Sequence, residues 1–172
     1  MIILTISYKL ITIIKNFVFC LGLCKCSPTS ILMVNSGKNE IVEIDNSFNV
    51  IRRYSGRNLF SKNISDVACS GGYIYIADAG ACQVVMMNKE GSVVKRFGRA
   101  GTGNQEFKRP NGICVDSKGR VIVSDSLNHR VKVRLHYSFH FNQLQVINNL
   151  SCLLYTSPSP RDATLSRMPS SA

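Results

Sequence analysis

The sequence is short of acidic residues and of histidine, and it has none of the common catalytic motifs. Its 172 residues contain 10 Asp and Glu against 21 Lys and Arg, which gives a formal net charge of +11, and only three His. No G-x-S-x-G elbow, phosphate-binding Walker loop or pair of catalytic carboxylates is present. The basic excess is spread along the chain without a dense Lys/Arg run, so it is compatible with a polyanionic partner without demonstrating one.

No apolar stretch is long enough and clean enough to be a membrane span. Residues 1–26 are apolar, but Lys9, Lys15 and Asn16 interrupt them. A span needs about 20 largely uncharged residues, and a signal peptide needs an unbroken apolar core followed by a small-residue cleavage site. Two interpretations of residues 1–30 stay open: a signal-anchor-like segment and non-native translated sequence.

The cysteines lack the spacing of a zinc site. The Cys20-x-x-x-Cys24-x-Cys26 cluster has no second ligand pair, and Cys69, Cys82 and Cys114 are isolated within apolar runs. We expect the isolated cysteines to behave as small buried hydrophobes in a reduced, cytoplasmic protein. The apolar N-terminus leaves a secreted or membrane-anchored location open.

The C-terminal residues do not continue the pattern of the middle. The strings CLLYTSPSPRD (152–162) and SRMPSSA (166–172) resemble translated sequencing adaptors, so residues 152–172 are expected to be disordered and are set aside. Residues 134–151 are expected to be irregular, either as read-through sequence or as an irregular strand pair.

The same pattern of apolar runs, a polar residue and a short turn occurs three times in residues 31–133. Placing Asp78 over Asp125, an offset of 47, aligns Val84-Val85 with Val131-Lys132. Placing Asn35 over Asp78, an offset of 43, aligns the apolar segments that follow. Each unit contains short β-branched runs separated by turn residues, and no window shows helical periodicity.

Four short strands in about 45 residues predict the blades of a β-propeller, because a single four-stranded blade must cover its two faces with neighbours. The predicted fold class is therefore all-β, an incomplete β-propeller with about two and a half antiparallel four-stranded blades. The predicted boundaries are a partial blade at 31–56, a blade at 57–98 and a partial blade at 99–133.

The last of these units resembles the NHL repeat. Residues 91–133 contain the Asn128-His129-Arg130 triplet and a Gly98…Phe107…Gly112 spacing similar to that family, while residues 57–98 match more loosely. NHL propellers occur in tripartite-motif proteins, where the resemblance implies a non-catalytic platform for RNA or protein and a link to ubiquitin transfer through a RING domain. No RING is present in this sequence.

Repeats related to the NHL repeat also form a secreted peptide-amidating lyase, which this sequence resembles in its repeats. That activity requires a metal held by spaced histidines, and only His129 lies within the repeats. We therefore expect no enzyme activity, metal or cofactor. Alternatives that stay open are a fragment of such a secreted enzyme and a module that binds only proteins.

Alternation of hairpins places the loop between blades and the turn between the second and third strands on one face. Binding to RNA would use Lys and Arg for phosphates and Asn111, Asn128 or Phe107 for unstacked bases. The alternative is that these are ordinary solvated charges. The candidate contacts for RNA or protein are Arg57, Lys62, Arg99, Lys108, Arg109, Asn111, Asn128 and Arg130.

Other repeat positions are predicted to be structural. Asp78 and Asp125 each end a strand and are expected to accept hydrogen bonds from the following turn. His129 is expected to bridge adjacent blades, and Gly98 and Gly112 to meet the needs of the repeat backbone. No sequence feature indicates DNA specificity, a small-molecule substrate or a membrane.

Overall fold

The computed structural model describes residues 20–56, 58–61, 63–135 and 145–148, and within these ranges the regular structure is almost entirely β. Twelve strands and one short 3-10 helix (Ser126–Asn128) are present in them. The strands form three four-stranded antiparallel sheets. The all-β prediction is therefore confirmed.

Each sheet is a meander, in which every strand pairs with the strand next to it in the chain. The first sheet runs in the order β1 (Cys20–Ser27), β2 (Ser30–Asn35), β3 (Glu40–Asp45) and β4 (Val50–Ser55). The second runs β5 (Ile64–Ser70), β6 (Tyr73–Asp78), β7 (Gln83–Asn88) and β8 (Val93–Phe97).

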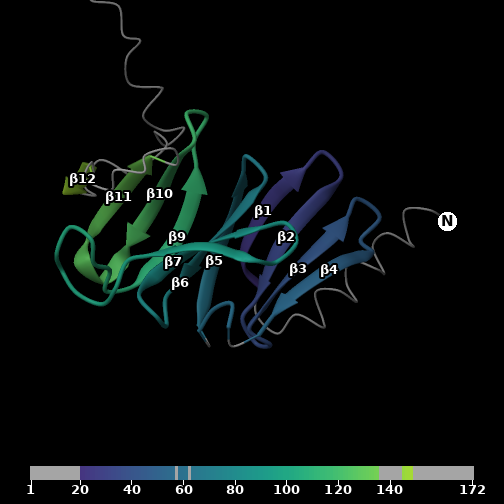
Figure 1. Cartoon of the computed structure of the whole chain (residues 1–172), viewed down its shortest axis with the longest axis horizontal. Coiled ribbons are helices and arrows are strands. Elements are labelled where there is room, and N and C mark those ends of the chain that lie inside the picture. Colours follow the sequence, from purple (N-terminus) through teal and green to yellow (C-terminus); the bar gives the residue numbers. More distant parts are fainter. Residues whose placement is uncertain (1–19, 57, 62, 136–144, 149–172) are drawn as a thin grey trace, which may run out of the picture.

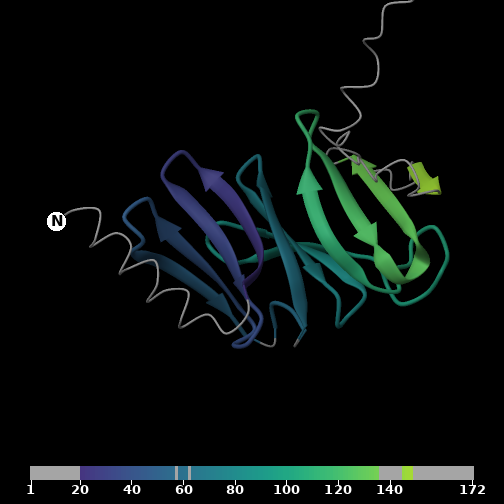
Figure 2. The same ribbon diagram turned by 180° about the vertical axis from the view of Figure 1, so that it is seen from behind.

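The third sheet repeats this order with β9 (Pro110–Val115), β10 (Arg120–Asp125), β11 (Arg130–Leu135) and β12 (Gln145–Asn148). The three sheets stand side by side as blades (Figure 1), and the view from behind shows the same succession (Figure 2). Their first strands are neighbours, since β5 contacts β1 on one side and β9 on the other. The arrangement is an arc of a β-propeller.

Two apolar layers hold the blades together. One lies between the first and second blades and includes Leu32, Ile41, Phe60, Ile76 and Val85, all 0–2% exposed. The other lies between the second and third blades. Its members come from both blades and from the loop that joins them: Ala68, Tyr75, Ala77, Val84, Phe107, Ile113, Val121 and Val123. Val84 and Val85, which are adjacent on β7, thus face the third and the first blade respectively, as strand alternation requires.

The blade boundaries differ from those predicted. The first blade has a complete inner strand at Cys20–Ser27, within the segment 1–30 that was expected to precede the repeats. At the other end, β11 continues to Leu135 and β12 supplies a fourth strand from the segment 134–151. The periodicity missed both strands because neither carries the alternation that marks the others. Residues 1–19 and the predicted adaptor segment 152–172 lie outside the described residues.

A disulfide joins Cys26 on β1 to Cys69 on β5. The prediction that Cys69 is an isolated buried thiol was therefore wrong. The two cysteines are separated by 43 residues, which is the repeat offset, so they occupy equivalent positions on the inner strands of neighbouring blades. Sequence spacing could not show this pairing, because the two strands meet only when the blades stack.

No helix within the described ranges has the length and apolar character needed to cross a membrane.

Candidate partner-binding face

The end of each second strand forms a polar corner, built on Asn35, Asp78 or Asp125. In the second blade, the buried Asp78 carboxylate accepts a hydrogen bond from the Ser61 N–H at 2.9 Å and another from the Ser61 hydroxyl. The Ala81 N–H and the Gln83 Nε2 also donate to it, at 3.2 and 3.1 Å. The carboxylate thereby ties the loop that enters the blade to the turn after the strand.

Asp125 has the same role in the third blade, where one of its hydrogen-bond donors is the charged guanidinium of Arg130. Its carboxylate is fully buried and accepts the backbone N–H groups of Lys108 and Arg109 at 2.9 and 3.2 Å. Asn128 Nδ2 and Arg130 Nε donate to the other oxygen at 2.7 and 2.9 Å. Burial alone raises the pKa of the Asp125 carboxyl, but these hydrogen bonds outweigh burial and hold the pKa below its usual value.

Comparison of the three corners reveals a partner five residues further on. Asn35 donates to Glu40 at 3.0 Å, Gln83 donates to Asp78, and Arg130 forms an ion pair with Asp125 at 2.9 Å. The carboxylate is the later residue of the pair in the first blade (Glu40) and the earlier residue in the other two (Asp78 and Asp125). The three corners therefore pair an amide with a carboxylate, a carboxylate with an amide, and a carboxylate with a guanidinium.

The depressed pKa of Asp125 predicts acid sensitivity. A lowered folded-state pKa stabilises the fold above the ordinary value of 3.8, and that stabilisation is lost as the pH falls through the folded-state pKa. The difference in free energy of unfolding between the unaltered chain and Asp125→Asn should therefore shrink below pH 3.8. Urea titrations at a series of pH values measure it, and a difference that stays constant down to about pH 2 contradicts the prediction.

The loop 98–109 connects the second and third blades and is braced internally. Glu106 accepts the Gly103 N–H and Arg99 Nε, both at 2.9 Å, and these bonds lower the pKa of its carboxyl. Gly98 has φ +97°, and a Cβ there would come within 2.4 Å of the Phe107 ring. Gly101 has φ +148°, and a Cβ there would meet the Glu106 carboxylate. The glycines are thus required by close contact within the loop.

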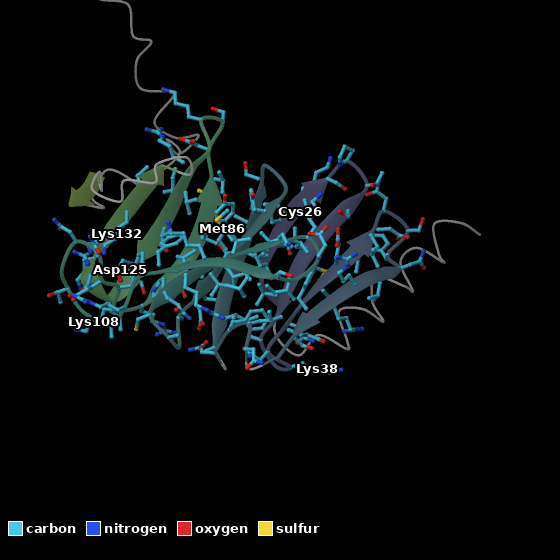
Figure 3. The ribbon with its side chains drawn as sticks, viewed as in Figure 1. Cys26, Lys38, Met86, Lys108, Asp125 and Lys132 are labelled. Carbon is cyan, nitrogen blue, oxygen red and sulfur yellow. A yellow bond between two sulfur atoms is a disulfide. The ribbon has the colours of Figure 1, made fainter. Side chains whose placement is uncertain are left out.

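Exposed basic side chains collect on the face that carries this loop. Lys38 in the β2–β3 turn and Lys108 and Arg109 at the end of the loop are exposed, and Asn111 follows on β9. Figure 3 shows Lys38 on the first blade and Lys108 beside the third blade, both toward the same edge of the arc. Arg99 is also exposed, although it pairs with Glu106. We call Lys38, Lys108 and Arg109 the basic face. The predicted residues Arg57 and Lys62 lie outside the described residues.

The structure corrects two of the predicted contact residues. Arg130 is 8% exposed, and its guanidinium donates to Asp125 and to the carbonyls of Thr102, Gly103 and Glu106 at 2.7–2.9 Å. Asn128 uses its amide on Gly101 O and Asp125. Both side chains are committed to the interior of the corner and not to a ligand, because buried carbonyls and carboxylates need donors.

Phe107 and His129 also differ from expectation. Phe107 is 1% exposed in the layer between blades, so its ring is not available to stack on a base. The His129 side chain is exposed, and its backbone has φ +50° and closes the 3-10 turn by donating to Ser126 O. The role of His129 is thus to end the 3-10 turn through its backbone conformation. Among the contacts that the structure describes, none joins the His129 side chain to a neighbouring blade.

Asp66 joins the inner strands of the second and third blades, and Gly112 joins β9 to β10 within the third blade. The Gly112 N–H donates to Ser124 Oγ at 2.7 Å, and the next residue, Ile113, donates its N–H to Asp66 Oδ2 at 2.9 Å. A Cβ on Gly112 would come within 3.1 Å of Ser124 Oγ, so a larger residue would press on this contact. Burial raises the pKa of the Asp66 carboxyl despite two backbone hydrogen bonds.

Sequence reasoning missed Lys132. Its side chain is 1% exposed, its ammonium lies 4.4 Å from the centre of the Phe107 ring, and it donates to the carbonyls of Gly103, Asn104 and Glu106. Figure 3 shows Lys132 and Asp125 both on the third blade. A signal was present, because the repeat aligns Lys132 with the buried Val85 of the second blade, where a charged residue is out of place.

Residues 107–133 match the family model of the NHL repeat. The chain carries an NHL repeat. A segment of 37 residues is 57% identical to protein lin-41 of Caenorhabditis elegans, and this match covers 22% of the chain but only 3% of lin-41. The predicted resemblance is thereby confirmed for the repeat.

Solved propellers share the fold of this NHL-repeat chain. Virginiamycin B lyase from Staphylococcus aureus superimposes with a TM-score of 0.57 at 13% identity, over 81% of this chain and 41% of the lyase. The WD40 β-propeller domain of Doa1 gives 0.57 at 15% identity, over 76% of this chain and 41% of that chain. Glutaminyl cyclase from Myxococcus xanthus gives 0.51 at 19% identity, over 75% and 56%. These likenesses establish the β-propeller fold alone.

The NHL repeat fits a non-catalytic binding module. Within the part of the chain that the structure describes, no three His, Cys, Asp or Glu side chains are grouped as metal ligands.

Proposed function

We propose that this NHL-repeat chain binds single-stranded RNA through the basic face, as part of a larger protein of the tripartite-motif type concerned with post-transcriptional regulation or ubiquitin transfer. The observation that supports this is the exposure of Lys38, Lys108 and Arg109 on one face, whereas the β11 cations Arg130 and Lys132 are buried. Among the residues that the structure describes, none of these three cations forms an ion pair with a carboxylate, so they are available to neutralise phosphates.

The geometry suits a flexible strand better than a duplex. Lys108 and Arg109 are consecutive, and Asp125 holds both of their backbone N–H groups, so their side chains leave the protein from a fixed point. Asn111 is exposed two residues later and offers an amide that can pair with a base edge. Phosphate contacts and hydrogen bonds to base edges are both part of the recognition of unstacked bases, and the Arg109 guanidinium offers a plane on which a base can stack.

The proposal is tested by reversing the charge of Lys108 and Arg109 together. We expect Lys108→Glu/Arg109→Glu to weaken binding of a labelled oligouridine of about twelve nucleotides by at least about tenfold, because two attractive phosphate interactions become repulsive. The slope of log affinity against log salt should fall by about 0.7 for each phosphate that is no longer neutralised. Fluorescence anisotropy at several salt concentrations measures both quantities.

A matched control changes the same charge on the opposite face. Lys89→Glu/Lys118→Glu alters two lysines in the β7–β8 and β9–β10 turns and should leave affinity within about twofold of the unaltered chain. Equal weakening by the two double variants would reduce the effect to net charge and would count against a specific face. Absence of oligouridine binding by the unaltered chain would favour a protein partner.

A further inference from the structure

The loops before the second and third blades differ in length. The first, 56–63, is four residues shorter than the second, 98–109. Phe60 and Phe107 occupy equivalent places in them, each directly before the residue whose N–H donates to the corner aspartate. The additional residues of the longer loop therefore lie between Gly98 and Phe107 and include Gly101 and Gly103.

Two substitutions in the third blade accompany the longer loop. Where the second blade has Gln83 and Val85, the third has Arg130 and Lys132, both on β11. Val85 is fully buried in the apolar layer that also contains Phe60. Lys132 is equally buried at the equivalent position and places its ammonium over the Phe107 ring.

Both cations turn toward the additional residues. Arg130 donates to Thr102 O at 2.7 Å and to Gly103 O and Glu106 O at 2.8 Å. Lys132 donates to Gly103 O and Asn104 O at 3.2 Å, and to Glu106 O. We call Arg130 and Lys132 the cation clamp, because together they gather the backbone carbonyls of residues 102–106.

We propose that the cation clamp positions Lys108 and Arg109 for phosphate contacts, so that the third blade presents an ordered basic loop. A loop with three glycines has large conformational freedom, and ordering it during binding would cost affinity. Fixing the loop before the ligand arrives removes that cost. This inference rests on the proposed RNA function for its ligand, whereas the ordering of the loop stands independently.

The first test measures the loop itself without any ligand. We expect Lys132→Val, which restores the residue of the second blade, to raise the rate of hydrogen exchange of the peptide covering 98–109 by about tenfold, because local opening becomes easier. Exchange over 40–49, in the β3–β4 hairpin of the first blade, should not change. Lys132→Met keeps the length of the side chain and should give the same result, whereas Lys132→Arg should restore protection.

The second test couples the clamp to binding. Lys132→Met should weaken oligouridine binding by about fivefold in the full chain, but should have no further effect when Lys108→Gln and Arg109→Gln are already present. This disappearance of the effect distinguishes positioning from a general decrease in stability, which would act in both backgrounds. Lys118→Met, which removes a lysine from the opposite face, should leave both affinity and exchange unchanged.

The two possible failures are distinguishable. Unchanged exchange of the 98–109 peptide in both Lys132→Val and Lys132→Met would overturn the cation clamp, whatever the ligand. Faster exchange combined with no oligouridine binding by the unaltered chain would overturn the RNA proposal, and with it the role of the clamp in RNA recognition. An additive effect of Lys132→Met on top of the Lys108→Gln/Arg109→Gln pair would also overturn positioning.

Discussion

Replacing Asp125 with alanine should lower the free energy of unfolding by about 3–5 kcal/mol, because it leaves a buried guanidinium without its counter-charge. Asp125 is fully buried and Arg130 nearly so, and their ion pair spans 2.9 Å. The backbone N–H groups of Lys108 and Arg109 also lose their acceptor. Urea denaturation followed by circular dichroism measures the change.

The second blade supplies a milder variant for comparison. Arg130→Gln gives the third corner the aspartate–glutamine pair of Asp78 and Gln83, so Asp125 keeps only uncharged donors. It should therefore cost less than Asp125→Ala, and Glu90→Gln in an exposed turn should stay within about 0.5 kcal/mol of the unaltered chain. If Arg130→Gln were as costly as Asp125→Ala, the unpaired Arg130 guanidinium would not be the cause of the loss in Asp125→Ala.

Removing the disulfide should cost about 4 kcal/mol, the value that loop-closure entropy gives for a link across 43 residues. Cys26→Ser removes the bond between β1 and β5, and the unfolded chain then loses the cross-link that restricts its conformations. Thermal unfolding of the oxidised chain, before and after the substitution, measures the effect.

The bond itself can be separated from the side chains that form it. Cys26→Ser, Cys69→Ser and the double variant should be equally destabilised, since each removes the same bond, and reducing agent should have no further effect on any of them. Cys114→Ser changes an exposed thiol and should leave stability unchanged. Destabilisation of the double variant by the sum of the two single effects would show that packing, and not the bond, is responsible.

Repetition made the fold predictable from the sequence. The alignment of Asn35, Asp78 and Asp125 located the second and third strands of every blade, because buried strands alternate and turns carry their own residue types. The same alignment failed for Cys20–Ser27 and Gln145–Asn148, whose place is determined by pairing with a neighbouring strand. Local sequence carries little information about such pairing.

The candidate site was predictable only in outline. Hairpin alternation correctly placed Lys108 and Arg109 at the surface, but it could not distinguish them from Arg130, whose guanidinium is directed inward. The difference depends on where the carbonyls of residues 102–106 lie, which is a property of the folded loop. Lys132 shows that a charged residue at an apolar repeat position is better interpreted as an interior group.

The unlike corners have a consequence for assembly of the chain. Repeat proteins are prone to docking one unit in the place of another, since the units are nearly alike. Here a hairpin ending in Glu40 set against the 98–109 segment would bring a carboxylate to a row of carbonyl oxygens, and Arg130 set against 56–63 would find a shorter segment than the one it binds. Such exchanges are therefore unfavourable, and we expect the different polar corners to favour docking of the blades in the order of the sequence.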